Sequence, residues 1–224
     1  MKTGARFALS GLVGLAVLGF LLFFPAGTFG YWQAWVFIAV FTAGSTLPSA
    51  CLARTDPAAL RRRMHGGPLV ETRRVQKFVI IGAFGTIFGM IAFSAYDHRM
   101  GWSAAPTWVC VAGDALIAVG LVAGVLVVVQ NRYAAATVRV EAGQTVASRG
   151  LYGIVRHPMY AANLVLMVGI PLALGSYWGV LFLIPNVLVL SLRILDEEKL
   201  LTQELTGYPE YTRLVRYRLI PHVW

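Results

Sequence analysis

The sequence predicts an all-α integral membrane protein with about six transmembrane helices. Composition is the first observation: of 224 residues, 58% are hydrophobic and 13% charged, with a mean hydropathy of +0.68. An ordinary soluble domain is less apolar than this. The second observation is a series of six apolar segments, and the third is a strong bias in the placement of basic residues between them. Together they exclude a soluble globular protein.

The apolar segments run over residues 7–24, 31–53, 78–96, 107–130, 159–174 and 178–194. A helix that crosses the hydrocarbon core needs about 20 residues, with a range of about 17–25. The first four segments satisfy this requirement. The fifth is short and is interrupted by Pro171 and followed by Gly175, so we expect the last two segments to form a tight helical hairpin.

The first segment resembles a signal peptide at its start but not at its end. A basic start and an apolar run are present, yet Phe23, Phe24 and Pro25 follow and no small-residue cleavage site stands out. We therefore expect a retained helix. Cys51 and Cys110 both lie in apolar runs and are interpreted as packing residues. We expect no metal, because the sequence has no C-x-x-C motif or His/Cys cluster.

Basic residues predict the orientation. All of the 19 Lys and Arg except Arg99 lie before the first segment, after the second, after the fourth, or at the end of the sixth and beyond it. Because such residues favour the cytoplasmic side, both termini are predicted to be cytoplasmic. The net charge of +9 then reflects topology, and no nucleic-acid partner is expected. The basic loop 54–77 could also attract anionic headgroups, although a purely topological role is the simpler reading. Aromatic residues mark the opposite interface: Tyr31, Trp32, Trp35, Trp102, Trp108, Tyr177 and Trp178.

Two glycine pairs and one carboxylate stand out within the apolar segments. Gly85 with Gly89, and Gly120 with Gly124, form G-x-x-x-G patterns. These could pack helices within the monomer or equally build a homo-oligomer. Asp114 lies inside the fourth segment, where a carboxylate indicates function by default. It is only about two turns from the outer end and could reach the interface, so it is not included among the catalytic candidates.

A polar stretch, 150–160, separates the fourth and fifth segments. Pro158 suits the first position of a helix, and His157 is biased toward an extended conformation because it precedes a proline. The stretch therefore presents Arg156, His157 and tyrosines at a helix N-terminus, where free N–H groups attract anions. The alternative is a membrane-surface loop without chemical function.

A second polar stretch begins at Arg193. Arg193 and Glu197 are four residues apart and share one face of a helix. Asp196, Glu197 and Glu198 place three carboxylates in adjacent positions, which repel one another unless a cation is near. A cationic ligand would relieve that repulsion. The alternative is a solvated helix neutralised by Lys199 and the arginines of the tail.

Residues 143–160, followed by Arg193, Glu197 and Glu198 and by residues 207–211, resemble the signatures of the isoprenylcysteine carboxyl methyltransferase family and its phospholipid methyltransferase relatives. The resemblance covers the last hundred residues, in the order and spacing of the family. The first three helices carry no such signal. We therefore divide the chain into N-terminal transmembrane helices, 1–130, and a methyltransferase core, 131–224, with a cytoplasmic cofactor cleft.

The resemblance implies S-adenosyl-L-methionine as the cofactor and assigns roles to individual residues. Arg193 and Glu197 are the implied catalytic residues, and Arg193 is the implied acceptor-binding residue. Tyr208 and Tyr211 are added as acceptor-binding candidates from their position in the tail, where they could cover the cofactor and exclude water. The implied cofactor-binding residues are Gln144, Thr145, Val146, Ala147, Tyr152, Arg156, His157, Pro158, Met159, Tyr160, Glu197 and Glu198. Two positions depart from the family: Gln144 replaces a typical histidine, and Leu151 a proline that is common in bacterial relatives.

The chemistry of the two polar stretches is compatible with this cofactor, which carries a carboxylate, an ammonium and a sulfonium. Arg156 and the helix N-terminus suit the anion, and Glu197 and Glu198 suit the cations. Arg193 favours a carboxylate acceptor, which would be a lipophilic molecule of the bilayer such as an isoprenoid or another lipid. Composition is compatible with a bacterial member, so we expect the bacterial cytoplasmic membrane. Two alternatives stay open: an NADPH-dependent reductase of the sterol type, and a non-catalytic membrane scaffold.

Overall fold

The computed structural model describes residues 2–55, 74–131, 133, 140 and 143–224, and this part of the chain is helical without strands. Arg132 and Arg139, two of the basic residues after the fourth segment, and residues 56–73 of the basic loop 54–77 lie outside the described residues. The helices, in order, are α1 (Lys2–Ala26), α2 (Trp32–Thr55), α4 (Arg74–Met100), α5 (Thr107–Gln130), α6 (Pro158–Ala173), α7 (Leu183–Glu204) and α8 (Tyr208–Leu214), with 3-10 turns η1 (Gly150–Gly153) and η2 (Trp178–Phe182).

Each predicted apolar segment coincides with a helix, which confirms an all-α polytopic membrane protein. Four helical stretches are long and apolar enough to span a bilayer: Trp32–Thr55, Val75–Met100, Thr107–Gln130 and Trp178–Glu204. The other two are shorter, namely Gly11–Ala26 within α1 and the whole of α6. The helix α1 as a whole has 25 residues, Lys2–Ala26, and includes all of the first predicted segment.

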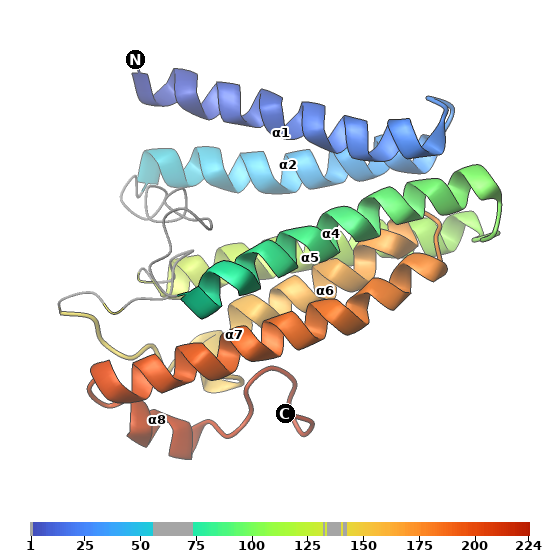
Figure 1. The fold of residues 1–224 in the computed structure, drawn as a ribbon. Helices are drawn as coiled ribbons and strands as arrows, with labels where there is room; N and C mark the ends of the chain where they lie inside the picture. Colours follow the sequence, from blue (N-terminus) through green and yellow to red (C-terminus); the bar gives the residue numbers. More distant parts are fainter. Residues whose placement is uncertain (1, 56–73, 132, 134–139, 141–142) are drawn as a thin grey trace.

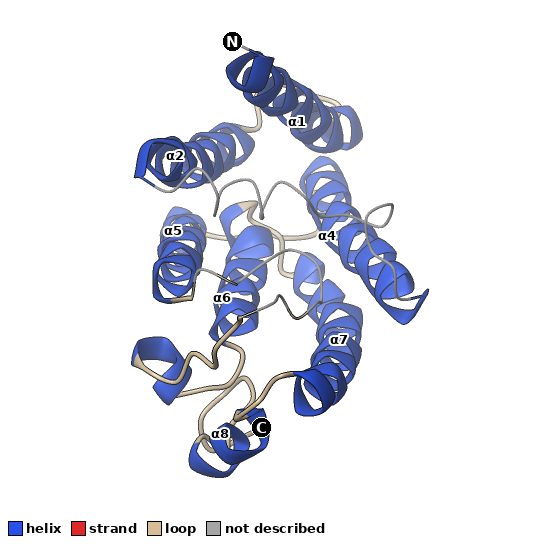
Figure 2. Ribbon diagram, turned by 90° about the vertical axis from the view of Figure 1, so that its left-hand side faces the viewer, coloured by secondary structure: helices blue, strands red, loops and turns tan. Residues whose placement is uncertain are grey.

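The short helix α6 lies at the centre of the bundle, with α5, α4 and α7 around it (Figure 2). Its tightest partner is α5, because glycines let the two backbones approach. A Cβ atom added to Gly113 would collide with the backbone of Ala173, and one added to Gly120 would collide with Ala162 and Leu166. The predicted hairpin of the fifth and sixth segments exists as α6, η2 and α7, but the close packing of α6 is with the helix that precedes it.

The G-x-x-x-G patterns serve packing within the chain at two of their four glycines. Gly120 faces α6, and a Cβ on Gly89 would meet the ring of Phe182. Gly124 has only the Met159 sulfur nearby, and a Cβ on Gly85 would meet nothing within 4 Å. Gly120 and Gly89 therefore allow close packing inside the chain. Small residues do this in membrane helices because close approach increases van der Waals contact.

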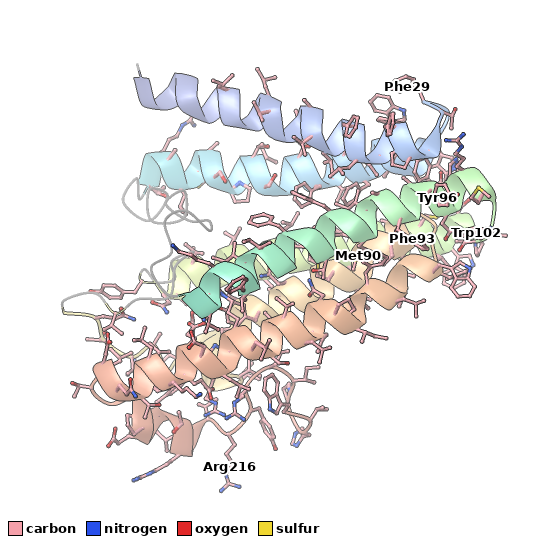
Figure 3. All side chains as sticks on the ribbon, in the orientation of Figure 1. Phe29, Met90, Phe93, Tyr96, Trp102 and Arg216 are labelled. Atoms are coloured by element: carbon pink, nitrogen blue, oxygen red, sulfur yellow. The ribbon has the colours of Figure 1, made fainter. Side chains whose placement is uncertain are left out.

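Both termini and all the stretches predicted to carry chemistry lie toward one end of the bundle. In Figure 1 this end holds the start of α1, the end of α2, the start of α4 and α6, the end of α7, and α8. Aromatic side chains gather at the opposite end, where Figure 3 labels Phe29, Tyr96 and Trp102. The sequence placed Tyr31 at this interface too, but the structure buries it completely. Its hydroxyl donates to Leu174 O at 2.5 Å, and its ring stacks on His98.

A buried carboxylate organises the loops at that aromatic end. Asp97 has no exposed surface and accepts hydrogen bonds from the Ser103 amide (2.9 Å), the Ser103 hydroxyl (2.6 Å) and the Ser176 hydroxyl (2.5 Å). Ser103 lies between α4 and α5, and Ser176 between α6 and η2. Asp97 therefore ties together the two connections on which the positions of α5 and α6 depend.

Candidate active site

The site is built around the start of α6. The helix begins at Pro158, as predicted, because proline suits a first position whose N–H has no partner. His157 precedes it with φ −122° and ψ 64°, and its side chain is buried. The amides of Arg156 and His157 donate to Tyr217 O (2.8 Å) and Arg218 O (2.9 Å). The C-terminal segment is thereby held against the entry to α6.

Glu198, near the end of α7, is surrounded by basic side chains from both polar stretches. Its Oε1 lies 3.2 Å from Arg156 Nε and 3.2 Å from His157 Nε2, and its Oε2 accepts a hydrogen bond of 2.9 Å from Arg218 Nε. Only 11% of the Glu198 side chain and 9% of the Arg156 side chain are exposed. Glu198 therefore locks α7, the entry to α6 and the C-terminal segment to one another.

Glu197 belongs to a different network, one residue away. Tyr160 on α6 donates its hydroxyl to Glu197 Oε2 at 2.5 Å, and Arg193 Nε donates to the same hydroxyl at 2.7 Å. The guanidinium also lies over the Tyr160 ring, 5.7 Å from its centroid. Arg193 and Glu197 thus share a face of α7, as their spacing predicts, and Tyr160 joins them.

Gln76 of α4 extends this network, although it was not among the predicted site residues. Its Oε1 accepts a hydrogen bond of 3.0 Å from a terminal nitrogen of Arg193, and its Nε2 donates to Asp196 Oδ2 at 2.5 Å. The side chain is fully buried. The sequence offered no signal for it, because Gln76 falls in the basic loop 54–77, before the apolar segment that begins at residue 78.

Three tyrosines lie on one side of the site: Tyr152 from the loop before α6, and Tyr208 and Tyr211 from α8. The Tyr211 hydroxyl donates to Tyr152 O at 2.7 Å, and the Tyr152 hydroxyl accepts from Asn131 Nδ2 at 3.0 Å. Tyr208 and Tyr211 are buried in an apolar cluster with Leu205 and Val215. Burial raises the pKa of Tyr152, Tyr208 and Tyr211, so that all three phenols stay neutral near pH 7.

Two buried polar atoms of this site make no hydrogen bond within the described part of the chain. They are the Tyr208 hydroxyl oxygen and Arg156 Nε, although the latter lies at ion-pair distance from Glu198. Buried polar atoms in native proteins are nearly always satisfied by protein, water or ligand. The two atoms are a phenol and a guanidinium, which are both hydrogen-bond donors. They fit a ligand that carries hydrogen-bond acceptors, such as a carboxylate.

Some of the remaining predicted cofactor residues lie near α8, and the others lie at the start of α6. Val146 packs against the cluster of Tyr208 and Tyr211, and Gln144 and Ala147 beside it are partly buried. Thr145 is exposed. Pro158 is buried, and the Met159 sulfur faces Gly124 on α5.

A region of the sequence that contains most of these groups matches a known family. Residues 108–207 match the sequence profile of the phospholipid methyltransferase family. This confirms the predicted resemblance over that part of the chain, which carries Tyr160, Arg193, Glu197 and Glu198. Gln76, Tyr211 and Arg218 lie outside the matched range. No curated protein matches the chain.

The match covers less than half of the chain, and over residues 108–207 the sequence is similar to phospholipid methyltransferases. One expectation for the site needs correction. The sequence placed Arg156 and Glu198 at separate poles of a cleft, one for an anion and one for a cation. In the structure the two side chains contact each other, because the entry to α6 and the end of α7 lie side by side at the same end of the bundle.

Proposed function

We propose that this protein transfers a methyl group from S-adenosyl-L-methionine to a lipophilic acceptor that enters from the bilayer, with a carboxylate as the favoured acceptor group. The observation that carries the proposal is the arrangement of Arg193, Tyr160 and Glu197. A cation and an anion of α7 meet at one tyrosine hydroxyl, within the segment that matches the methyltransferase family. Such a pair offers opposite charges to two reactants of opposite charge.

Two sets of residues fit the cofactor. Glu197 would hold its cationic part, because a carboxylate favours a nearby sulfonium or ammonium. Tyr208, whose buried hydroxyl makes no hydrogen bond among the described residues, would hold its carboxylate together with Arg156, whose Nε lies 3.2 Å from Glu198 without a hydrogen bond. Glu198 is compensated by Arg156, His157 and Arg218, and we assign it to positioning these groups rather than to binding a cation.

The bound cofactor supplies an electrophilic methyl group on a positively charged sulfur. Transfer to a carboxylate would form a bond from its oxygen to the methyl carbon and break the carbon–sulfur bond, which would leave a neutral thioether and a methyl ester. A carboxylate acceptor is already anionic and needs no general base. Arg193 would orient it through the planar fork of the guanidinium. Positioning then provides much of the rate enhancement.

Tyr160 keeps the two charged groups in register. Its hydroxyl donates to Glu197 and accepts from Arg193, so neither ion can turn away without breaking a charge-assisted hydrogen bond. Tyr208 and Tyr211 on α8 cover the site with the apolar cluster, which excludes water from the reacting groups. The C-terminal segment fixes this cover through Arg218 and Glu198.

Calorimetric titration of the purified protein with S-adenosylhomocysteine and, separately, with NADPH tests the proposal. We expect saturable binding of the first and none of the second. Glu197→Gln should weaken binding about tenfold, equivalent to about 1.4 kcal/mol, because the amide loses the charge that the ammonium group requires. Glu204→Gln is the matched control: it removes the same charge from an exposed position of the same helix and should bind normally.

The other outcomes identify the alternatives. Binding of NADPH alone would replace the proposal with a reductase. Absence of binding by either compound, in protein that remains folded, would indicate a non-catalytic membrane protein. Equal weakening by Glu197→Gln and Glu204→Gln would show that only the overall charge of α7 matters, and would remove Glu197 from the site.

A further inference from the structure

We propose that Gln76 is a positioning residue that fixes the guanidinium of Arg193 toward the methyl acceptor. This inference rests on the proposed function, and it assigns a role in the site to α4, which lies outside the family match. Gln76 is the third residue of α4, and no part of its surface is exposed. It contacts Arg193 and Asp196 of α7.

The two ends of the Gln76 amide hold two different charges. The carbonyl oxygen accepts from the terminal nitrogen of Arg193 at 3.0 Å, and the amino group donates to Asp196 Oδ2 at 2.5 Å. Glutamine alone among neutral side chains of this length offers an acceptor and a donor at once. Asparagine would be one methylene shorter, and leucine, which has no polar atoms, would leave both partly buried charges without this partner.

Two of the contacts that hold Arg193 come from other helices. Its Nε donates to Tyr160 on α6, and its terminal nitrogen donates to Gln76 on α4. Two hydrogen bonds to a planar group define its plane, so the remaining N–H groups of the fork point in a fixed direction. A guanidinium held only at Nε could rotate about its side-chain bonds. Fixing such a group before the acceptor arrives lowers the entropic cost of binding.

A second hydrogen bond joins α4 and α7 farther from the site and serves as a control. Asn186 Nδ2 on α7 donates to Thr86 Oγ1 on α4 at 3.1 Å. Thr86→Val removes this polar contact without touching Arg193. A loss of function that followed only from looser packing of α4 on α7 would therefore occur in Thr86→Val as well as in Gln76→Leu.

The experiment measures methyl transfer and arginine geometry separately. Tritiated S-adenosylmethionine and a total lipid extract from the host membranes are the probes for transfer. We expect Gln76→Leu to lower kcat/KM for the lipid by about tenfold to a hundredfold, the cost of a misplaced positioning group. Affinity for S-adenosylhomocysteine should stay within about twofold of the unmodified protein. Thr86→Val should lower thermal stability but leave both quantities unchanged.

Reversing the donor and the acceptor of the bond between Gln76 and Asp196 should restore activity. Gln76→Glu alone sets two carboxylates against each other and should also lose activity. Gln76→Glu combined with Asp196→Asn restores a donor opposite an acceptor, and keeps an oxygen for Arg193. We expect this double variant to recover most of the rate. Rates equal to those of the unmodified protein in Gln76→Leu, or absence of rescue in the double variant, would overturn the inference.

A spectroscopic readout keeps this test separate from that of the proposed function. The Nε–H resonance of Arg193, observed in protein labelled with ¹⁵N-arginine and assigned with Arg193→Lys, reports the guanidinium environment without any substrate. It should shift in Gln76→Leu, return in the double variant and stay in place in Thr86→Val. An unmodified protein that does not transfer methyl groups would refute the proposed function, whereas an unshifted resonance in Gln76→Leu would refute the role of Gln76.

Discussion

Glu198 is a mostly buried carboxylate that contacts three basic side chains. It compensates Arg156, His157 and Arg218 within 3.2 Å, and no other described carboxylate forms an ion pair with these three. Replacement by glutamine would leave basic groups buried beside an amide that presents two further donors. Removal of one member of a buried ion cluster costs about 3–5 kcal/mol.

Glu198→Gln is therefore expected to lower the unfolding free energy by about 3 kcal/mol. Thermal unfolding in detergent, followed by tryptophan fluorescence, measures this. Glu210→Gln, an exposed carboxylate of α8, is the comparison variant and should unfold like the original protein. Equal stability of Glu198→Gln and Glu210→Gln would contradict the structural role of the cluster.

The residue scale is also where the sequence was least informative. Spacing placed Arg193 and Glu197 on one face, because both lie in one helix. Nothing in the sequence connects Gln76 with Asp196, 120 residues away, since a contact between helices depends on how they pack. The same holds for Glu198 and Arg218. Their pairing requires the C-terminal segment to return to the start of α6, and no local pattern predicts that return.

At the scale of elements, the packing of α5 on α6 depends on glycine. A Cβ on Gly113 would overlap the backbone of Ala173, which no side-chain movement can relieve. Gly113→Ala should therefore destabilise the protein by about 1–3 kcal/mol, the usual cost of overpacking. Gly85→Ala is the control, because its Cβ would meet nothing within 4 Å and alanine favours a helix.

Thermal unfolding again measures both glycine variants. The result that would contradict the packing is a Gly113→Ala protein as stable as Gly85→Ala. Activity should follow stability here, since α6 carries Tyr160 and begins at the candidate site. A shift of α6 away from α5 would move Tyr160 relative to Arg193 and Glu197.

The elements themselves were largely predictable. Apolar length located the helices, and Pro158 located the start of α6 to the residue. The partner of α6 was not predictable from the short connection to α7, because proximity along the chain does not decide which helices approach most closely. The glycines of α5 decide it, and their pattern is compatible with several partners.

At the scale of the whole molecule, the candidate site lies at one end of the bundle and the aromatic side chains lie at the other. The charge bias predicts that the end with the candidate site faces the cytoplasm. Cysteine accessibility in intact cells tests the orientation in a Cys51→Ser background. A membrane-impermeant maleimide should label Ala104→Cys, which is exposed at the aromatic end. It should label Gln203→Cys, which is exposed at the other end, only after the cells are permeabilised. The reverse pattern would contradict the predicted orientation.

The shortness of α6 sets the depth at which a reaction would take place. Sixteen residues give a helix of about 24 Å, whereas the hydrocarbon core is about 30 Å thick. The entry to α6 therefore lies below the plane in which a full-length helix would end. A lipid that reacts at the membrane surface must withdraw methylene groups into water, at about 0.8 kcal/mol each. A recessed entry would spare a lipid acceptor this cost, because its tail could stay in the bilayer while its polar group approached Arg193.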